Sequence, residues 1–157
     1  MEYNTLSYPE AGFSLCETSR QTISISPYPP PDDLVAGDVL FLPAMMKVLI
    51  VEDNKAMRHL LRSIVGEWAE VFECENGSQA LSCYERVRPE WVLMDIRLPG
   101  INGIEATRRI LASHAEARVV IVTNFADQRM RESARLAGAC GYVLKEDLSV
   151  LREILNQ

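Results

Sequence analysis

A short apolar run that ends in an acid is the feature of this sequence most able to do chemistry. Trp91–Met94 is apolar, Asp95 follows it directly, and the next residues include Pro99, Gly100 and Gly103. A run of this length bounded by turn residues is typical of a buried strand. A carboxylate at the carboxyl end of a strand in an open α/β sheet lies beside the crevice where such folds bind ligands. An aspartate here can also simply cap a turn, so its meaning depends on which side chains join it.

Further reactive or charged side chains follow other predicted strands. They are Glu52, Asp53, Thr123 and Lys145. Because parallel strands end on one edge of the sheet, these residues are expected to meet Asp95 there. Each has an ordinary alternative, since Asp53 or Asn54 can cap a helix, Thr123 can cap a turn, and Lys145 can be solvated. Their coincidence at equivalent positions favours one shared site over separate accidents.

This set of side chains predicts a phosphoryl-accepting site. Three clustered carboxylates repel one another and attract a cation, and hard oxygen ligands with room for water suit Mg²⁺. With the charge neutralised, Asp95 can attack a phosphoryl group and form an acyl phosphate. The Lys145 ammonium and the Thr123 hydroxyl would donate to the phosphoryl oxygens.

Alternating apolar runs and helix-period segments predict the elements that position these residues. Strands are expected at about 47–52, 70–74, 91–95, 118–123 and 140–144. Helices are expected at about 54–67, 78–87, 103–114, 127–137 and 147–156. Five strand and helix rounds indicate an α/β fold, a doubly wound parallel sheet with helices on both faces.

Particular residues support the predicted helices. An apolar stripe marks the first helix and consists of Met57, Leu60, Leu61, Ile64 and Val65. Ser78 and Asp127 are plausible N-caps of the second and fourth helices. The inner face of the last helix would be formed by Leu148, Leu151, Ile154 and Leu155. We expect no output domain after it.

The first 45 residues differ in composition from the rest. They hold six of the eight prolines, six acids and Arg20 as the one basic residue. The stretches 22–25 and 39–42 resemble short strands but lack convincing partners. We therefore divide the chain into an acidic, Pro-rich, mostly disordered extension (1–45) and one domain (46–157). Met46 opens the first strand so directly that it could be the translation start; the alternative is that residues 1–45 are a genuine regulatory tail.

Charge, cysteines and hydropathy limit the function classes. The net charge is −6, and neither part of the chain has the basic bias of a nucleic-acid binder. The four cysteines are scattered without a Cys-x-x-Cys pair, which favours free thiols in a reducing cytoplasm. No apolar run approaches membrane length, and the N-terminus carries acids where a secretory signal has bases. We expect a cytoplasmic protein without membrane or direct DNA binding.

Residues 46–157 resemble a response regulator receiver domain of two-component signalling. The motifs are Val-Glu-Asp-Asn at 51–54, Met-Asp-Ile-Arg-Leu-Pro-Gly-Ile-Asn-Gly at 94–103, Ile-Val-Thr at 121–123 and Gly-Tyr-Val-Leu-Lys at 141–145. The resemblance implies a flavodoxin-like sheet of order 2-1-3-4-5. It also implies a stand-alone receiver that takes its phosphoryl group from a histidine kinase or a histidine phosphotransfer protein. The signal would then pass to an unknown downstream protein.

The resemblance also assigns roles to residues. Asp95 would be the phosphoacceptor, and Mg²⁺ would be held by Glu52, Asp53, Asp95 and the backbone carbonyl of Arg97. Lys145 would pair with the phosphate, Thr123 would sense it, and Tyr142 would be the switching aromatic. The ordinary alternative for Tyr142 is a half-buried strand residue whose hydroxyl finds some partner. A homodimer through the face of the fourth helix, fifth strand and fifth helix is a further expectation.

Three positions depart from the common family pattern. Asn124 and Phe125 follow Thr123 where a small residue is usual first, and both could crowd the phosphate. Glu146 follows Lys145 where many relatives have proline, often after a cis bond. A cis bond before glutamate would cost about 2.5–4 kcal/mol.

Rival interpretations are less well supported. A phosphatase of the haloacid-dehalogenase kind would need a second aspartate two residues after Asp95, where Arg97 stands. A receiver-like interaction module acting without phosphorylation remains the main alternative, although such modules usually lack a site residue. His59 and His114 lie on predicted helices without a companion nucleophile or metal cluster, which favours surface or half-buried histidines.

The division of the chain can be tested by truncation. A shortened chain of residues 46–157 should unfold at the same temperature as the full chain, because the extension has too little patterned apolar sequence to form a core. Thermal unfolding followed by circular dichroism measures this. A fall of many degrees in the shorter chain would show that residues 1–45 stabilise the domain.

Overall fold

The computed structural model describes residues 45–156, and these form a five-stranded parallel sheet. The strands are β1 (Met46–Val51), β2 (Ala69–Cys74), β3 (Trp91–Met94), β4 (Val119–Thr123) and β5 (Gly141–Leu144). Their order across the sheet is β2-β1-β3-β4-β5. The predicted α/β class, the parallel sheet and the flavodoxin-like order are therefore confirmed.

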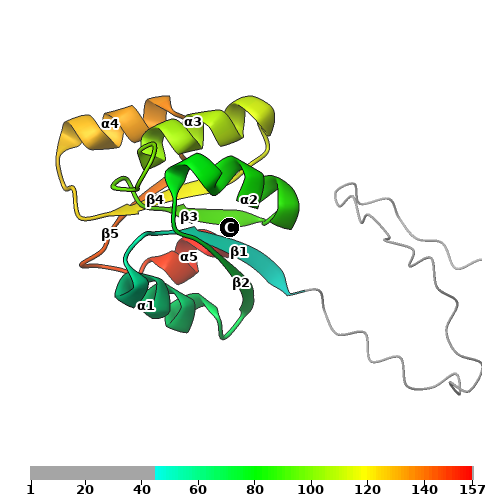
Figure 1. Cartoon of the computed structure of the whole chain (residues 1–157). Helices are drawn as coiled ribbons and strands as arrows, with labels where there is room; N and C mark the ends of the chain where they lie inside the picture. The colour runs from blue at the N-terminus through cyan, green and yellow to red at the C-terminus, as the bar shows by residue number, and fades with distance from the viewer. Residues whose placement is uncertain (1–44, 157) are drawn as a thin grey trace, which may run out of the picture. The chain divides into compact units, whose positions relative to one another are not determined.

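Helices cover both faces of this sheet (Figure 1). They are α1 (Lys55–Val65), α2 (Ala80–Val87), α3 (Gly103–Ser113), α4 (Gln128–Leu136) and α5 (Leu151–Leu155), with a short 3₁₀ turn η1 (Gly77–Gln79) before α2. Helices α1 and α5 lie on one face, and α2, α3 and α4 lie on the other. The described chain is thus a three-layer α/β/α sandwich.

Successive side chains of a strand point to opposite faces of the sheet, which explains why two hydrophobic cores form. Leu49 and Val51 of β1 pack toward α2, α3 and α4, whereas Val48 and Ile50 pack toward α1 and α5. Every residue of β3 and β4 is buried. A strand covered on both faces needs a continuous apolar run, which is what these two segments have.

The helix N-termini agree with the sequence prediction at one of two positions. The Asp127 side chain accepts a hydrogen bond from the backbone N–H of Met130, which confirms it as the N-cap of α4. The prediction that Ser78 caps the second helix is wrong. The Asn76 side chain accepts from the Ser78 N–H and starts the 3₁₀ turn, and α2 begins only at Ala80.

Other differences concern exposure and helix length. Leu60 is 45% exposed, so it does not belong to the inner stripe of α1. The last helix begins at Leu151 and not at 147, and Leu148 is buried just before it. Residues 45–156 contain no cis peptide bond, so the bond between Lys145 and Glu146 is trans. The predicted extension, including the stretches 22–25 and 39–42, lies outside the described residues apart from Met45.

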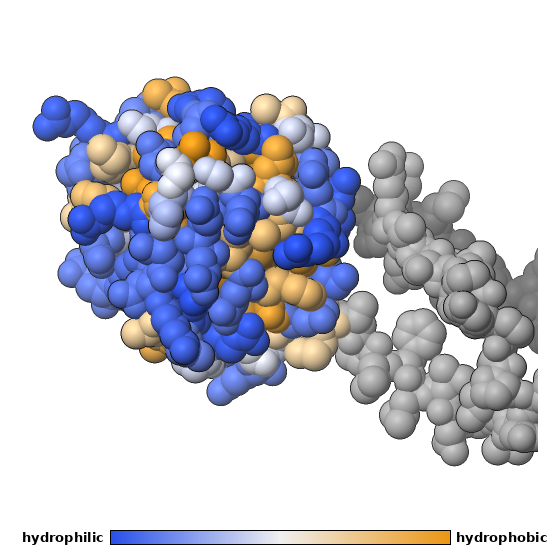
Figure 2. Space-filling model, in the orientation of Figure 1, coloured by the Kyte–Doolittle hydropathy of each residue, from blue (hydrophilic) through white to orange (hydrophobic). Residues whose placement is uncertain are grey.

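Hydrophilic residues predominate on the face of the domain drawn in Figure 2, with smaller hydrophobic patches between them. Among residues 45–156, no helix is both long and apolar enough to span a membrane. Cys74, Cys83 and Cys140 are free thiols, as expected, and Cys16 lies outside the described residues.

The loop after β3 depends on glycine where it starts α3. A Cβ atom at Gly103 would lie 1.8 Å from the backbone oxygen of Asp95 and 2.9 Å from Cγ of Met94. The Gly103 N–H donates to the Ile96 carbonyl at 2.9 Å. The start of α3 is therefore packed directly against the backbone of Asp95.

Gly103→Ala should destabilise the domain although alanine is the better helix former. Overpacking of this kind costs about 1–3 kcal/mol, and urea unfolding measures the loss. Ser113→Ala, at the exposed other end of α3, is the control and should change the free energy of unfolding by at most about 0.5 kcal/mol. Equal stability of the two variants would contradict this packing.

Candidate functional site

The residues expected to meet do so at the carboxyl edge of the sheet. Val51 of β1 pairs with Met94 of β3, so Glu52 and Asp95 leave adjacent strands at the same level. The Asp95 N–H donates to the Val51 carbonyl at 2.9 Å. At the other side of the site, the Lys145 N–H donates to the Thr123 carbonyl at 2.9 Å, which keeps β4 and β5 together at their ends. The strand register thus places these residues along one rim.

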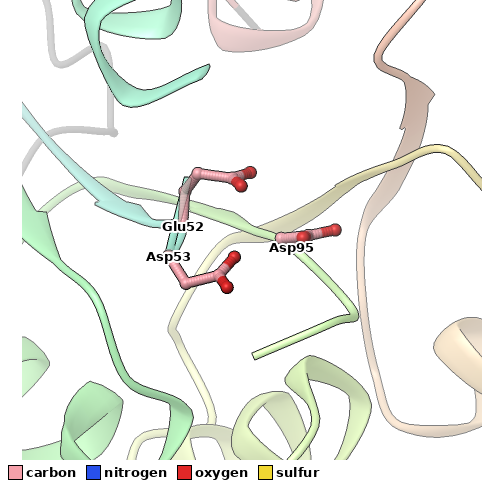
Figure 3. Close-up of side chains that lie close together, drawn as sticks. All are labelled: Glu52, Asp53 and Asp95. Atoms are coloured by element: carbon pink, nitrogen blue, oxygen red, sulfur yellow. The ribbon is translucent and has the colours of Figure 1, made fainter. Parts of the chain in front are cut away.

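Three carboxylates converge at this rim and form what we call the acidic pocket, made of Glu52, Asp53 and Asp95. One carboxylate oxygen of each lies within 4.8 Å of the others. Figure 3 shows the three side chains pointing to the same side of the strand ends. Glu52 and Asp95 are buried, with 1% and 4% of the whole residue exposed, while Asp53 is exposed. The pocket is therefore closed beneath and open on the Asp53 side.

The ammonium group of Lys145 forms ion pairs with two of these three acids. Nζ of Lys145 lies 2.7 Å from Oε2 of Glu52 and 3.0 Å from Oδ2 of Asp95. The second oxygen of Asp95 accepts a hydrogen bond from the Ile96 N–H at 2.8 Å. Burial raises the pKa of the Glu52 carboxyl above its usual value and the Asp95 charge adds to this, while Lys145 acts in the opposite direction.

The donor set suits a hard divalent cation. All three side chains offer carboxylate oxygens, and three formal negative charges face one ammonium. Within residues 45–156, no basic side chain forms an ion pair with Asp53. An exposed carboxylate next to two buried ones leaves room for the water ligands that Mg²⁺ retains. The acidic pocket is thus consistent with a receiver-type Mg²⁺ site.

Two hollows border the site, one at Asp53 and one at Lys145. A groove of about 770 Å³ is lined by Asp53, Arg97 and Phe125 together with polar and apolar residues of the β3–α3 loop, α3 and α4. A smaller cavity of about 330 Å³ lies on the other side, beside Asn124 and Lys145. Asn124 and Phe125, the two unusual residues after Thr123, therefore line the approaches to the site.

Phe125 also connects the remaining predicted residues. The buried Thr123 hydroxyl accepts a long hydrogen bond, 3.5 Å, from the Phe125 N–H, and the Tyr142 hydroxyl donates to the Phe125 carbonyl at 2.8 Å. The Arg97 guanidinium lies over the Phe125 ring, 5.2 Å from its centroid. Arg131 lies 4.6 Å from the Tyr142 ring centroid. The sequence marked Phe125 only as a departure, yet its backbone links Thr123 to Tyr142.

Sequence reasoning missed Arg58. Its side chain is 6% exposed, and its guanidinium contacts the backbone carbonyls of both Glu52 and Asp53. A signal was present, because positions 58, 61 and 65 follow helical spacing and place Arg58 on the same face as Leu61 and Val65. A charged residue on a buried helix face requires partners.

The histidines lie as expected. His59 is exposed on α1. His114 ends α3, is half-buried and stacks on Tyr84 with ring centroids 5.1 Å apart. Its Nδ1 lies 3.0 Å from a guanidinium nitrogen of Arg88. These contacts account for His114 as a packing residue.

Comparison with known proteins agrees with the geometry. The family model of the response regulator receiver domain matches residues 48–156. Chemotaxis protein CheY of Halobacterium salinarum is 40% identical over 100 residues, covering 63% of this chain and 83% of the relative. Response regulator GacA of Pseudomonas syringae pv. syringae is 37% identical, and the matched segment spans only 49% of its length.

A solved structure covers the same segment. The BeF3-activated N-terminal receiver domain of Klebsiella pneumoniae RstA superimposes with a TM-score of 0.64 at 28% identity. The match covers 71% of this chain and 99% of that domain. The sequence motifs, the strand order and the acidic pocket all agree with the match to the receiver domain family. The chain belongs to the response regulator receiver domain family of two-component signalling.

Proposed function

We propose that this protein accepts a phosphoryl group on Asp95 from a histidine kinase or a histidine phosphotransfer protein. The observation that carries the proposal is the Lys145 ammonium held between Glu52 and Asp95 inside the acidic pocket. Such a cation beside a strand-end carboxylate suits an incoming phosphoryl group. The signal then passes on by protein contact or relay, without direct DNA binding.

The residues of the site would have separate roles in the phosphoryl transfer. Glu52, Asp53 and the Arg97 carbonyl would hold Mg²⁺, which when bound neutralises charge on the carboxylates and the phosphoryl oxygens. The Ile96 N–H fixes Oδ1 of Asp95, which leaves Oδ2, beside Lys145, to attack phosphorus. The bond between phosphorus and the donor nitrogen breaks, its electrons stay on the imidazole, and an acyl phosphate forms. Lys145 then turns from the carboxylate to a phosphoryl oxygen.

Asp95→Asn should abolish phosphorylation because the amide is not a nucleophile at this position. The full chain is incubated with Mg²⁺ and acetyl phosphate, and bound phosphate is counted by mass spectrometry of the intact protein. Wild type should gain one phosphate and the variant none. Asp147→Asn, an exposed acid two residues after Lys145, is the control and should gain one phosphate. Unchanged labelling of Asp95→Asn would refute the assignment of Asp95 as the phosphoacceptor, whereas an unlabelled wild type would favour the interaction module that acts without phosphorylation.

We further propose that Thr123 and Tyr142 report the phosphorylated state through Phe125. A phosphoryl group on Asp95 would draw the Thr123 hydroxyl toward one of its oxygens and away from the Phe125 N–H. The Phe125 backbone would then shift, and with it the acceptor of the Tyr142 hydroxyl. Because two arrangements of this network need differ by only a few kcal/mol, phosphate can shift the population between them.

The shifted surface is the face of α4, β5 and α5, where Arg131 lies on the Tyr142 ring. Arg129 and Arg135 stand on the same helix. We propose this face as the contact for the downstream protein or for a second copy of the chain. A change in the Tyr142 rotamer would move Arg131 and so alter the charge that a partner meets.

Thr123→Ala should uncouple the switch from phosphorylation. Asp95 should still take up phosphate, since its own contacts are intact, while amide NMR shifts along 124–145 on adding beryllofluoride should shrink. Thr107→Ala is the matched control, because Thr107 is also buried but donates to Gly103 on its own helix. Equal responses in wild type and Thr123→Ala would rule out this coupling.

A further inference from the structure

One buried charged side chain has no part in the chemistry described above. Among residues 45–156, the buried polar or charged residues are Glu52, Arg58, Asp95, Thr107 and Thr123. Glu52, Asp95 and Thr123 belong to the site, and the Thr107 hydroxyl donates to the Gly103 carbonyl. Arg58 is the residue of this group that remains to be explained.

The Arg58 guanidinium joins the acidic pocket to the end of β2. Its Nη1 donates to the Glu52 carbonyl at 2.8 Å and to the Asp53 carbonyl at 2.9 Å. Its Nε donates to Glu73 at 3.2 Å, and its Nη2 pairs with Glu75. Burial acts to raise the pKa of Glu73, but Arg62 and Arg58 outweigh it and hold that pKa below its usual value. The guanidinium is therefore fixed in place by two carboxylates while it holds two carbonyls.

The two carbonyls need this partner. β1 ends at Val51, so Glu52 and Asp53 have left the sheet ladder. The Glu52 N–H is still held by the Cys74 carbonyl at 3.0 Å, but the Glu52 and Asp53 carbonyls point to α1. A buried carbonyl without a donor is costly. Arg58 supplies that donor for Glu52, where the contact is buried, and for Asp53, where it is partly buried; these are two of the three residues that present carboxylates to the pocket.

We propose that Arg58 is a positioning residue for metal binding: it fixes the backbone of Glu52 and Asp53 so that their carboxylates face Asp95. This inference rests on the proposed function, in which those carboxylates hold Mg²⁺. Groups that orient metal ligands from behind typically change metal affinity by roughly 10–100-fold when they are removed. In this protein, Nη1 of Arg58 would orient the metal ligands by holding their backbone carbonyls, and it would not contact the metal itself.

The sign of the effect separates positioning from plain electrostatics. Arg58 carries a positive charge close to a cation site, and it offsets Glu73 and Glu75. If charge alone mattered, removing Arg58 would leave those two acids unbalanced and Mg²⁺ would bind more tightly. If Arg58 positions the ligands, removing it weakens Mg²⁺ binding.

The test is Mg²⁺ affinity of the full chain by calorimetric titration, in wild type, Arg58→Met and Arg58→Lys. Methionine keeps much of the length of the arginine side chain but has neither its charge nor its hydrogen-bond donors. Arg58→Met should therefore bind Mg²⁺ roughly 10–100-fold more weakly than wild type. Lysine keeps the charge and can donate to the carbonyls, but it cannot also hold both glutamates, so its affinity should fall between the two. An affinity equal to or tighter than wild type in Arg58→Met would overturn the proposal.

Two further measurements keep the test decisive. If circular dichroism shows that Arg58→Met fails to fold, Arg58→Lys decides: lysine cannot hold both glutamates and both carbonyls at once, so wild-type affinity in that variant would refute the proposal. In a folded Arg58→Met, saturating Mg²⁺ should restore labelling by acetyl phosphate, since Asp95 and Lys145 are untouched. A persistent loss of labelling at saturating Mg²⁺ would contradict an effect on metal binding.

Asp53→Asn separates this inference from the proposed function. It should lose most Mg²⁺ affinity if the acidic pocket is the metal site. Wild-type affinity in Asp53→Asn would refute the proposed metal site itself. Loss of affinity in Asp53→Asn together with wild-type affinity in Arg58→Met would refute only the role of Arg58.

Discussion

The ion pair that Lys145 makes with Glu52 and Asp95 is the interaction on which the site depends. All three side chains are nearly withdrawn from water, with exposures of 7%, 2% and 5%. Removing one partner of such a buried pair typically costs about 3–5 kcal/mol, because the other charge is left uncompensated. Two acids that share one ammonium also leave a surplus of negative charge, which favours binding of a cation. In the proposed function, this cation and Lys145 then attract the phosphoryl group.

The parallel sheet makes this arrangement possible. Every residue of β3 and β4 is buried, as are residues 48–51 of β1, and within the described residues none of these runs contains a charged side chain. Polar side chains can be placed only where the strands end, and parallel strands end together. Two further residues support the backbone at this rim. Arg58 donates hydrogen bonds to the carbonyls of Glu52 and Asp53. Gly103, which lacks a side chain, allows α3 to approach the backbone of Asp95.

The sequence was most informative where one strong physical constraint acted alone. The runs at 91–94 and 119–123 had to be apolar to lie between two helix layers, and the polar residue that ends each run, Asp95 or Thr123, was visible as an exception. Local hydrogen bonding was harder to predict. Ser78 had the right residue type for a cap, but the Asn76 side chain accepts from the Ser78 N–H and starts the 3₁₀ turn, so Ser78 lies inside that turn and does not begin a helix. The hydrogen bonds of the Arg58 side chain join residues 5 to 17 positions apart, and the bond from Tyr142 to Phe125 spans 17 positions. Several of the acceptors are backbone carbonyls, which a residue pattern does not show.

Chemical trapping can establish whether Asp95 is the nucleophile of this site, as proposed. The wild-type chain is treated with acetyl phosphate and Mg²⁺ and then with sodium borohydride, which reduces an aspartyl phosphate to homoserine. Peptide mass spectrometry locates the change. We expect homoserine at position 95, and none when Mg²⁺ is chelated beforehand. Homoserine at another acid, or stable phosphate on His59 or His114 with Asp95 intact, would contradict the account.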